Sequence, residues 1–289
     1  MPMPTAHGII QHRKIPETAV IKYAVIGNPI QHSKSPQIHT AFARQEGVAL
    51  EYQRMLSKTD CFIADVNAFH ANGGLGLNVT VPFKIDAYHH CSQLDNYALA
   101  AQAVNTISFN SSGDWLGANT DGIGLLRDLT CNLNLELQQR SILILGAGGS
   151  VRGILLPLLR QQPNQITIAN RTLAKAEQLA EQFSIHGNIT ACAYQQLGSD
   201  PYDLVINATS ASLNQALPPI PDGIVSPASF CYDLAYSDQA TVFMQWAARL
   251  GVDSISDGIG MLIEQAAESY AIWRGYRPDT EQIFKLLRP

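Results

Sequence analysis

The stretch SILILGAGGSVRG, residues 141–153, joins an apolar strand to a glycine-rich turn and then to a helix. Glycines at such a turn let the backbone approach a pyrophosphate, and the helix N-terminus offers free N–H groups and a partial positive charge. Val151 stands at the third glycine position of the dinucleotide-binding pattern, but strand, turn and helix follow in the required order. The stretch therefore predicts a dinucleotide-binding α/β domain; the alternative is a glycine-rich turn without a ligand.

The end of the next predicted strand, QITIA at 165–169, carries Asn170, Arg171 and Thr172, with Lys175 one helical turn further on. NAD-binding forms of this fold place an Asp or Glu here, which accepts hydrogen bonds from the ribose hydroxyls. A guanidinium and an ammonium group suit the 2′-phosphate of NADP, which an acid would repel. The segment predicts NADP(H) as the cofactor, with solvated charges at a strand end as the alternative. Thr172 is also a candidate N-cap.

Two successive runs of alternating strands and helices, from about residue 20 and again from about residue 141, predict an α/β protein of two domains. A length of 289 residues agrees with that number. A connecting helix is predicted within 119–134, and the final helical pattern at 261–276 is expected to pack back on the first unit. We predict a substrate domain from 1–121 and 258–289, with a mixed, mostly parallel sheet, and a Rossmann-like NADP domain from 122–257.

The composition narrows the class of protein. A net charge of −5 and the lack of a basic stripe argue against nucleic acid as a partner, although a small anion could bind a local basic site. No segment approaches the ~20 apolar residues of a membrane span, and the first 20 residues lack a signal-peptide core. We therefore expect a soluble, cytoplasmic protein. The sequence leaves open whether it is a monomer or a homodimer.

Cysteine and histidine usage predicts no metal. The five cysteines are odd in number, widely spaced and free of CxxC pairs, which argues against a disulfide framework and a zinc site, and favours reduced thiols in a cytosol. His89 and His90 are neighbours, and adjacent helical positions point in different directions. No HExxH motif is present.

Polar residues gather at predicted turns of the first unit, in GNPIQHSKSP (27–36), NVTVPFK (78–84), AVNT (103–106) and NTDG (119–122). The carboxyl ends of parallel strands collect such turns at one edge, where ligands bind. Ser33 and Ser35 stand just before Pro36, which is expected in the first turn of a helix, and they could hold a carboxylate or simply serve as turn and cap residues.

Lys84 follows the strand and turn of NVTVPFK, and Asn105 and Asp121 are expected to follow other strand-like runs. An amine, an amide and a carboxylate could together hold a polyhydroxylated ring and move a proton. Each residue taken alone would be interpreted as surface polarity.

These motifs continue in order through GAGGSVRG, NRT, INATS, YDLAY and DGIGMLIEQA, and with them the chain resembles the shikimate dehydrogenase family across nearly all of 23–276. The resemblance implies reversible, NADPH-dependent reduction of 3-dehydroshikimate to shikimate, on the route to chorismate and aromatic amino acids. The implied alternative is a quinate/shikimate dehydrogenase with broader substrate or cofactor use. From another class, a non-catalytic NADP sensor would have no reason to keep Lys84, Asp121 and Gln265 together.

Carried over residue by residue, the resemblance implies a catalytic pair, Lys84 and Asp121. The implied substrate-binding residues are Ser33, Ser35, Asn78, Thr80, Lys84, Asn105, Asp121, Tyr236 and Gln265. The implied cofactor-binding residues are Gly146, Ala147, Gly148, Gly149, Ser150, Asn170, Arg171, Thr172, Lys175, Leu234 and Gly258. The serines would hold the substrate carboxylate with Thr80 nearby, and Leu234 and Gly258 would line the nicotinamide site. Lys84 would deliver the proton to the carbonyl oxygen, either as an acid or as a cation that stabilises the oxyanion.

The chain departs from the family pattern at a few positions. Ser150 stands where Ala is common, and Lys175 stands where Arg is frequent, which keeps the charge but loses the planar fork. INATSASLN, 206–214, lacks a glycine that often follows this motif.

Overall fold

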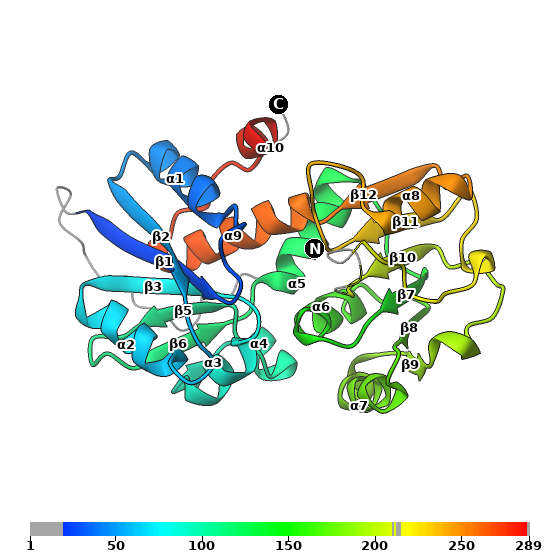
Figure 1. Cartoon of the computed structure of the whole chain (residues 1–289), viewed down its shortest axis with the longest axis horizontal. Coiled ribbons are helices and arrows are strands. Elements are labelled where there is room, and N and C mark those ends of the chain that lie inside the picture. The colour runs from blue at the N-terminus through cyan, green and yellow to red at the C-terminus, as the bar shows by residue number, and fades with distance from the viewer. Residues whose placement is uncertain (1–19, 210, 212–214, 288–289) are drawn as a thin grey trace. The chain divides into compact units, whose positions relative to one another are not determined.

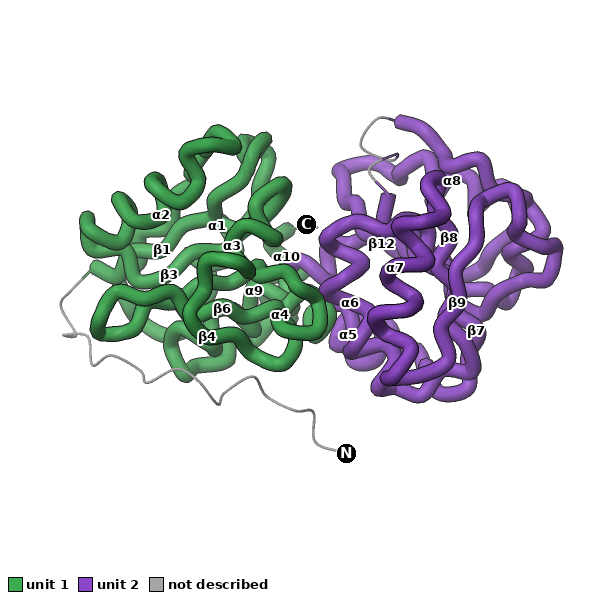
Figure 2. The backbone as a smooth tube through the Cα atoms, turned by 90° about the horizontal axis from the view of Figure 1, so that it is seen from below, with its two compact units in different colours: residues 1–124, 263–289 green, residues 125–262 purple. Residues whose placement is uncertain are grey.

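The computed structural model describes residues 20–209, 211 and 215–287 (Figure 1). By its internal contacts the chain divides into two compact units, 1–124 with 263–289 and 125–262 (Figure 2). The two divisions fall inside helices α5 (Asp121–Arg127) and α9 (Ile259–Arg274), so the chain passes from one unit to the other within helices. The boundaries predicted from the sequence, after 121 and after 257, stay a prediction.

The first unit is built on a mixed six-stranded sheet, in the order β2-β1-β3-β5-β6-β4. Its strands are β1 (Ile21–Gly27), β2 (Leu50–Leu56), β3 (Gly74–Val79), β4 (Gln93–Leu94), β5 (Thr106–Phe109) and β6 (Trp115–Ala118). β1 pairs in parallel with β2 and β3, and β4 pairs in parallel with β6. β5 is antiparallel to both of its neighbours, β3 and β6. The prediction of a mixed, mostly parallel sheet is confirmed.

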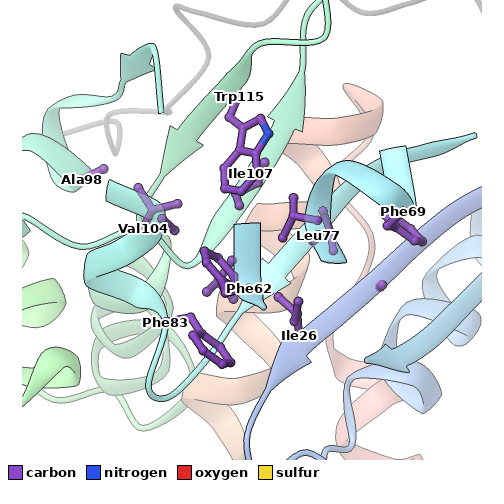
Figure 3. Packing of buried hydrophobic residues seen from close by; sticks show 13 residues of the cluster. Ile26, Phe62, Phe69, Leu77, Phe83, Ala98, Val104, Ile107 and Trp115 are labelled. Atoms are coloured by element: carbon purple, nitrogen blue, oxygen red, sulfur yellow. The ribbon is translucent and has the colours of Figure 1, made fainter. Parts of the chain in front are cut away.

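Helices cover both faces of this sheet. They are α1 (Ser35–Glu46), α2 (Phe62–Ala71), α3 (Lys84–His90) and α4 (Asn96–Ala101), together with most of α9, and the unit also contains α10 (Glu281–Leu287). Because side chains alternate along a strand, Ile26 on β1 packs toward α2 and α3, whereas Tyr23 stacks on Trp273 of α9 with ring centroids 4.4 Å apart. Leu77 on β3 lies within the first of these two cores (Figure 3). The final long helix therefore packs back on the first unit, as predicted.

The second unit holds six parallel strands in the order β12-β11-β10-β7-β8-β9. Its strands are β7 (Ser141–Leu145), β8 (Gln165–Ala169), β9 (Ile189–Cys192), β10 (Leu204–Asn207), β11 (Phe230–Asp233) and β12 (Ser254–Asp257). Its helices are α6 (Gly149–Leu159), α7 (Leu173–Phe183) and α8 (Val242–Arg249), with short turns η2 (Ser184–His186), η3 (Tyr194–Gln196) and η5 (Asp222–Ile224). The strand order reverses between β7 and β10, which is the point where open α/β sheets bind ligands. The Rossmann-like prediction is confirmed.

The predicted connecting helix is an α-helix followed by a π-helical turn. α5 ends at Arg127 and the chain continues as a π-helical turn, η1 (Asp128–Asn132). The buried Asp128 carboxylate accepts a hydrogen bond from the Tyr232 hydroxyl of β11 at 2.6 Å, which anchors this turn in the second unit. Ile123, Leu125, Leu126 and Leu129 are all buried, as their helical spacing predicts.

In the described part of the chain, no helix combines the length and the apolar character needed to cross a membrane. The prediction about the first 20 residues falls on a segment of which the structure describes only Val20.

Replacing Leu77 by Ala should lower the free energy of unfolding by about 3 kcal/mol, because Leu77 is fully buried between β3 and α2 and its loss leaves a cavity. Denaturant unfolding of the whole chain measures this change. Leu99→Ala is the matched control, since Leu99 is 49% exposed, and its effect should stay within about 0.5 kcal/mol. Equal losses for the two variants would contradict the packing.

Candidate functional site

The loop after β1 carries the two predicted carboxylate-binding serines. α1 begins at Ser35 with Pro36 in its first turn, as predicted. The Ser33 hydroxyl donates to the Ser35 hydroxyl at 3.1 Å, and the Ser33 carbonyl accepts two hydrogen bonds from the Arg54 guanidinium, at 2.6 and 2.9 Å. Arg54 therefore holds the loop from β2, and the two hydroxyls lie side by side.

The loop after β3 lies against the loop after β1. The Thr80 amide donates to the Ile26 carbonyl at 3.0 Å, and the Thr80 methyl group lies so close to Gly27 that a Cβ there would overlap it. Lys84 is the first residue of α3, and its carbonyl accepts the Val104 amide at 2.8 Å. β1 and β3 are parallel neighbours, so their carboxyl ends bring these loops to one edge of the sheet.

The predicted catalytic residues form an ion pair. Lys84 Nζ lies 2.5 Å from Asp121 Oδ2, and the two side chains are only 12% and 7% exposed. Asn105 Nδ2 donates to the other carboxylate oxygen at 2.7 Å and lies 3.3 Å from Gln265 Oε1. The structure thus brings Lys84, Asp121, Asn105 and Gln265 together, with an ammonium group held in place by a carboxylate whose two oxygens are both bound. Such a pair can deliver or receive a proton at Nζ.

The position of Asn105 differs from the expectation. Asn105 does not follow a strand but precedes β5, whereas Asp121 follows β6 as expected. Because β5 runs antiparallel to β3, its amino end lies at the same edge of the sheet as the carboxyl end of β3. The residue reaches the predicted cluster by this reversal of direction.

Asn78 has all its polar atoms bound within the protein. Its Oδ1 accepts the Tyr52 hydroxyl at 2.8 Å, and its Nδ2 donates to Ser269 Oγ at 3.0 Å and to Thr106 Oγ1 at 3.3 Å. A direct contact between Asn78 and a substrate hydroxyl stays a prediction.

Sequence reasoning missed a buried layer behind these residues, formed by Tyr52, Thr106, Thr120 and Ser269. His39 supports it, with its ring stacked on Tyr52 at 4.4 Å between centroids, and burial lowers the pKa of His39 to about 3, so the ring is neutral. Ser269 lies four residues after Gln265, on the same face of α9, and this spacing is the one signal that could have pointed to it.

The glycine turn of the second unit follows β7 directly. Gly146 has φ +109°, a conformation that favours glycine, and its amide donates to the Ala169 carbonyl at 2.8 Å. Gly148 and Gly149 have open space where a Cβ would stand, and no acid lies in the first turn of α6. Val151 is fully buried, so it packs in the core rather than facing the turn. Ala147 and Ser150 complete this turn. An anion would meet bare backbone N–H groups here.

The segment after β8 presents exposed cations. Arg171 and Lys175 are exposed, and neither forms an ion pair with a described residue. The Asn170 side chain donates to the Thr172 carbonyl at 2.9 Å, which fixes the turn between them. Thr172 occupies the N-cap position of α7, but its side chain makes no cap hydrogen bond. Two unpaired cations beside the glycine turn fit a phosphate of NADP(H).

The two residues predicted to line the nicotinamide site, Leu234 and Gly258, contact each other. Gly258, directly after β12, packs on Leu234 after β11 so closely that a Cβ on Gly258 would overlap the Leu234 carbonyl oxygen. Tyr236, two residues further along, is half-buried. In the INATSASLN motif, Asn207 Oδ1 accepts the Thr209 hydroxyl at 2.8 Å, whereas 210 and 212–214 lie outside the described residues.

Comparison with known proteins identifies the family of the chain. Family models match the chain as the shikimate dehydrogenase substrate binding domain (25–107), shikimate / quinate 5-dehydrogenase (129–216) and the shikimate 5'-dehydrogenase C-terminal domain (258–288). The shikimate dehydrogenase (NADP(+)) of Nitrosomonas eutropha is 50% identical over 266 residues, which are 92% of this chain and 96% of that protein. The chain belongs to the shikimate dehydrogenase family.

Solved structures place the whole two-unit fold in the shikimate dehydrogenase family as well. An Ael1 enzyme from Pseudomonas putida is 44% identical with a TM-score of 0.87, over 92% of this chain and 98% of that one. The shikimate 5-dehydrogenase of Thermus thermophilus, solved in complex with NADP(H) and shikimate, is 27% identical with a TM-score of 0.83, over 93% of this chain and 99% of that one.

Asp95 supports the loop that carries Asp121. Its Oδ1 accepts hydrogen bonds from the Ala98 amide at 2.6 Å and the Asn119 amide at 3.3 Å, and Asn119 Oδ1 accepts the Asp121 amide at 3.1 Å. Asp95 Oδ2 is buried without a hydrogen-bond partner among the described residues. Burial raises the pKa of Asp95 from 3.8 to about 6.

The raised pKa predicts a loss of stability as the pH rises from about 4 to about 6, because the native carboxyl holds its proton over a range in which the unfolded one has lost it. Asp95→Asn keeps the acceptor oxygen and cannot ionise. The free energy of unfolding of the variant minus that of the unchanged protein should therefore be larger at pH 7 than at pH 4, by at most about 3 kcal/mol. Denaturant unfolding at both pH values measures this; parallel pH dependence of the two proteins would contradict it. The exposed Asp60→Asn is the control.

Proposed function

We propose that the protein is an NADP-dependent shikimate dehydrogenase, which reduces the C3 carbonyl of 3-dehydroshikimate to the hydroxyl of shikimate. The observation that carries the proposal is the largely buried ion pair of Lys84 and Asp121 at 2.5 Å. Reduction of a ketone needs a proton at the carbonyl oxygen as negative charge develops there, and a positioned ammonium group can supply it. Half of the aligned residues are identical to those of a relative with this name.

Each residue of the pair has a separate task. Lys84 Nζ holds the proton that passes to the carbonyl oxygen and takes it back in the reverse direction. Asp121 orients the ammonium group and accepts from a ring hydroxyl, while Asn105 fixes the carboxylate from its other side. When bound, NADPH supplies the hydride.

Other side chains hold the substrate. Ser33, Ser35 and Thr80 offer hydroxyls for the carboxylate, and they lie on the two adjacent loops after β1 and β3. Gln265, beside Asn105, binds ring hydroxyls, and Tyr236 borders the substrate. Hydroxyl donors suit a carboxylate that must be released again, since they bind it without the full strength of a salt bridge.

The cofactor binds the second unit. The turn from Gly146 to Ser150 binds the pyrophosphate at the start of α6, and Arg171 and Lys175 bind the 2′-phosphate.

The five cysteines are free thiols, in keeping with a reducing cytosol, where we place the reaction.

Lys84→Ala should reduce kcat for NADP-linked shikimate oxidation by about 10² or more, because the proton donor is lost. Steady-state assays in both directions measure it. Lys58→Ala removes an exposed lysine from the same unit and should leave kcat unchanged. Near-normal turnover of the Lys84 variant would remove the residue from the mechanism, whereas NADP binding without any turnover by the unchanged protein would favour a non-catalytic NADP sensor.

Arg171→Ala should weaken NADP(H) binding by roughly tenfold or more and leave NAD(H) binding nearly unchanged, because only NADP carries the 2′-phosphate. Titration of cofactor fluorescence with each nucleotide gives the two dissociation constants. Arg160→Ala removes another exposed arginine of the same unit and serves as the control. Equal weakening of both cofactors would contradict the assignment.

Quinate is the second candidate substrate, because the family model matching 129–216 describes shikimate / quinate 5-dehydrogenases. Initial rates with shikimate and quinate, each with NADP and NAD, separate the two functions. We expect shikimate with NADP to give the highest kcat/KM, since no acid stands at the ribose end of the cofactor segment.

A further inference from the structure

We infer that Ser269, on α9, is a positioning residue for the reaction, acting through Asn105 on the carboxylate of Asp121. The inference rests on the roles proposed above for Lys84 and Asp121. It adds a residue outside the motifs that carry the family resemblance, and it follows from the hydrogen-bond geometry of the first unit.

Ser269 is fully buried at the centre of four polar groups. Its Oγ lies 2.8 Å from Thr106 Oγ1, 3.1 Å from Thr120 Oγ1 and 3.0 Å from Asn78 Nδ2, and 3.0 Å from the Gln265 carbonyl. A hydroxyl has one proton to donate and two lone pairs to accept. The four contacts therefore compete, and counting protons decides which are hydrogen bonds.

The count starts at Asn105, whose amide has only two hydrogens. The shortest contacts of Nδ2 are with Asp121 Oδ1 at 2.7 Å and Thr120 Oγ1 at 2.9 Å. Thr120 Oγ1 thus accepts, and its own proton needs an acceptor. Ser269 Oγ is the nearest at 3.1 Å, against 3.3 Å to Asn105 Oδ1 and 3.5 Å to Gln265 Oε1.

From Ser269 the same direction continues. The Ser269 proton goes to Thr106 Oγ1, its shortest contact, and Thr106 donates to Asn105 Oδ1 at 2.9 Å. The hydrogen bonds close into a ring through Asn105, Thr120, Ser269 and Thr106, in which each hydroxyl donates once and accepts once. Hydrogen bonds that run in one direction strengthen each other.

The second lone pair of Ser269 accepts Asn78 Nδ2, and Asn78 is itself oriented from outside the ring. Burial raises the pKa of Tyr52 well above its usual value, so its hydroxyl keeps its proton and donates to Asn78 Oδ1 at 2.8 Å. The Asn78 amide group must then turn its N–H groups toward Ser269 Oγ at 3.0 Å, and toward Thr106 Oγ1 and the Asn105 carbonyl, which both lie at 3.3 Å.

The ring fixes which way the Asn105 amide faces. With Oδ1 held by Thr106 and the Thr120 amide, Nδ2 points its remaining hydrogen at Asp121. A flipped amide would place an oxygen against the carboxylate instead, which repels it. Ser269 is the one ring member that α9 contributes, so this helix acts through Asn105 on the geometry of Asp121.

The test compares two buried serines of the same unit. Ser269→Ala opens the ring, whereas Ser108→Ala, two residues after Thr106 on β5, removes a buried hydroxyl that has no hydrogen-bond partner among the described residues. We expect kcat/KM for shikimate to fall about tenfold in Ser269→Ala, the equivalent of one positioning hydrogen bond, and to stay within twofold in Ser108→Ala. KM for NADP should be unchanged in both.

Thr106→Val breaks the same ring at the next hydroxyl with little change in volume, and it decides the case if Ser269→Ala does not fold. It should show the same loss, and the double variant should lose no more than either single one, because a ring is opened only once. Thermal unfolding monitors the folded fraction of each variant.

Two results would overturn the inference. The first is a value of kcat/KM for folded Ser269→Ala, or for Thr106→Val, that equals the value for Ser108→Ala. The second is a double variant whose loss of kcat/KM is the product of the two single losses. An inactive unchanged protein or an active Lys84→Ala variant would instead overturn the proposed function, so the two failures are distinguishable.

Discussion

The charge on Asp121 is the constraint around which the first unit is arranged. Burying a carboxylate and an ammonium group together costs desolvation free energy. Their mutual attraction offsets this cost only when their remaining lone pairs and protons are hydrogen-bonded. Here Lys84 binds one carboxylate oxygen and Asn105 the other, and the Asp121 amide is bound by Asn119. A single missing partner would leave charge uncompensated in a site that is less than one-eighth exposed.

This requirement explains the polar layer between the sheet and α9. Most of the surface that a helix buries against a sheet is apolar, as it is where Tyr23 stacks on Trp273. One turn away, Ser269 contacts two threonines and one asparagine, and each of these polar groups finds a partner in the layer. Ser108, on the same strand as Thr106, has no hydrogen-bond partner in the described part of the chain, which marks where the layer ends.

The second unit meets a simpler demand, the binding of phosphate groups. Its parallel strands reverse order beside β7, and the turn at Gly146 precedes the start of α6. Arg171 and Lys175 are exposed cations without ion-pair partners among the described residues. Each of these features is local: a glycine conformation, a helix start and two charges close together in the chain. No buried network is needed to hold them.

The locality of that unit is why the sequence by itself determined so much of it. Strand, glycine turn, helix and the missing acid at Asn170 and Arg171 are neighbours in the chain, so the spacing of residues fixes their spatial relation. The loops of the first unit and the residues Lys84 and Asp121 were also predicted, because their motifs stand at strand ends. Tertiary structure alone decided the rest. Because β5 is antiparallel to β3, Asn105 at the amino end of β5 lies at the same edge of the sheet as the carboxyl end of β3. Helix α9 places Ser269 beside residues more than a hundred positions earlier in the chain. Hydrogen bonds depend on distances of tenths of an ångström between segments far apart in the chain, and no pattern within a single segment encodes them.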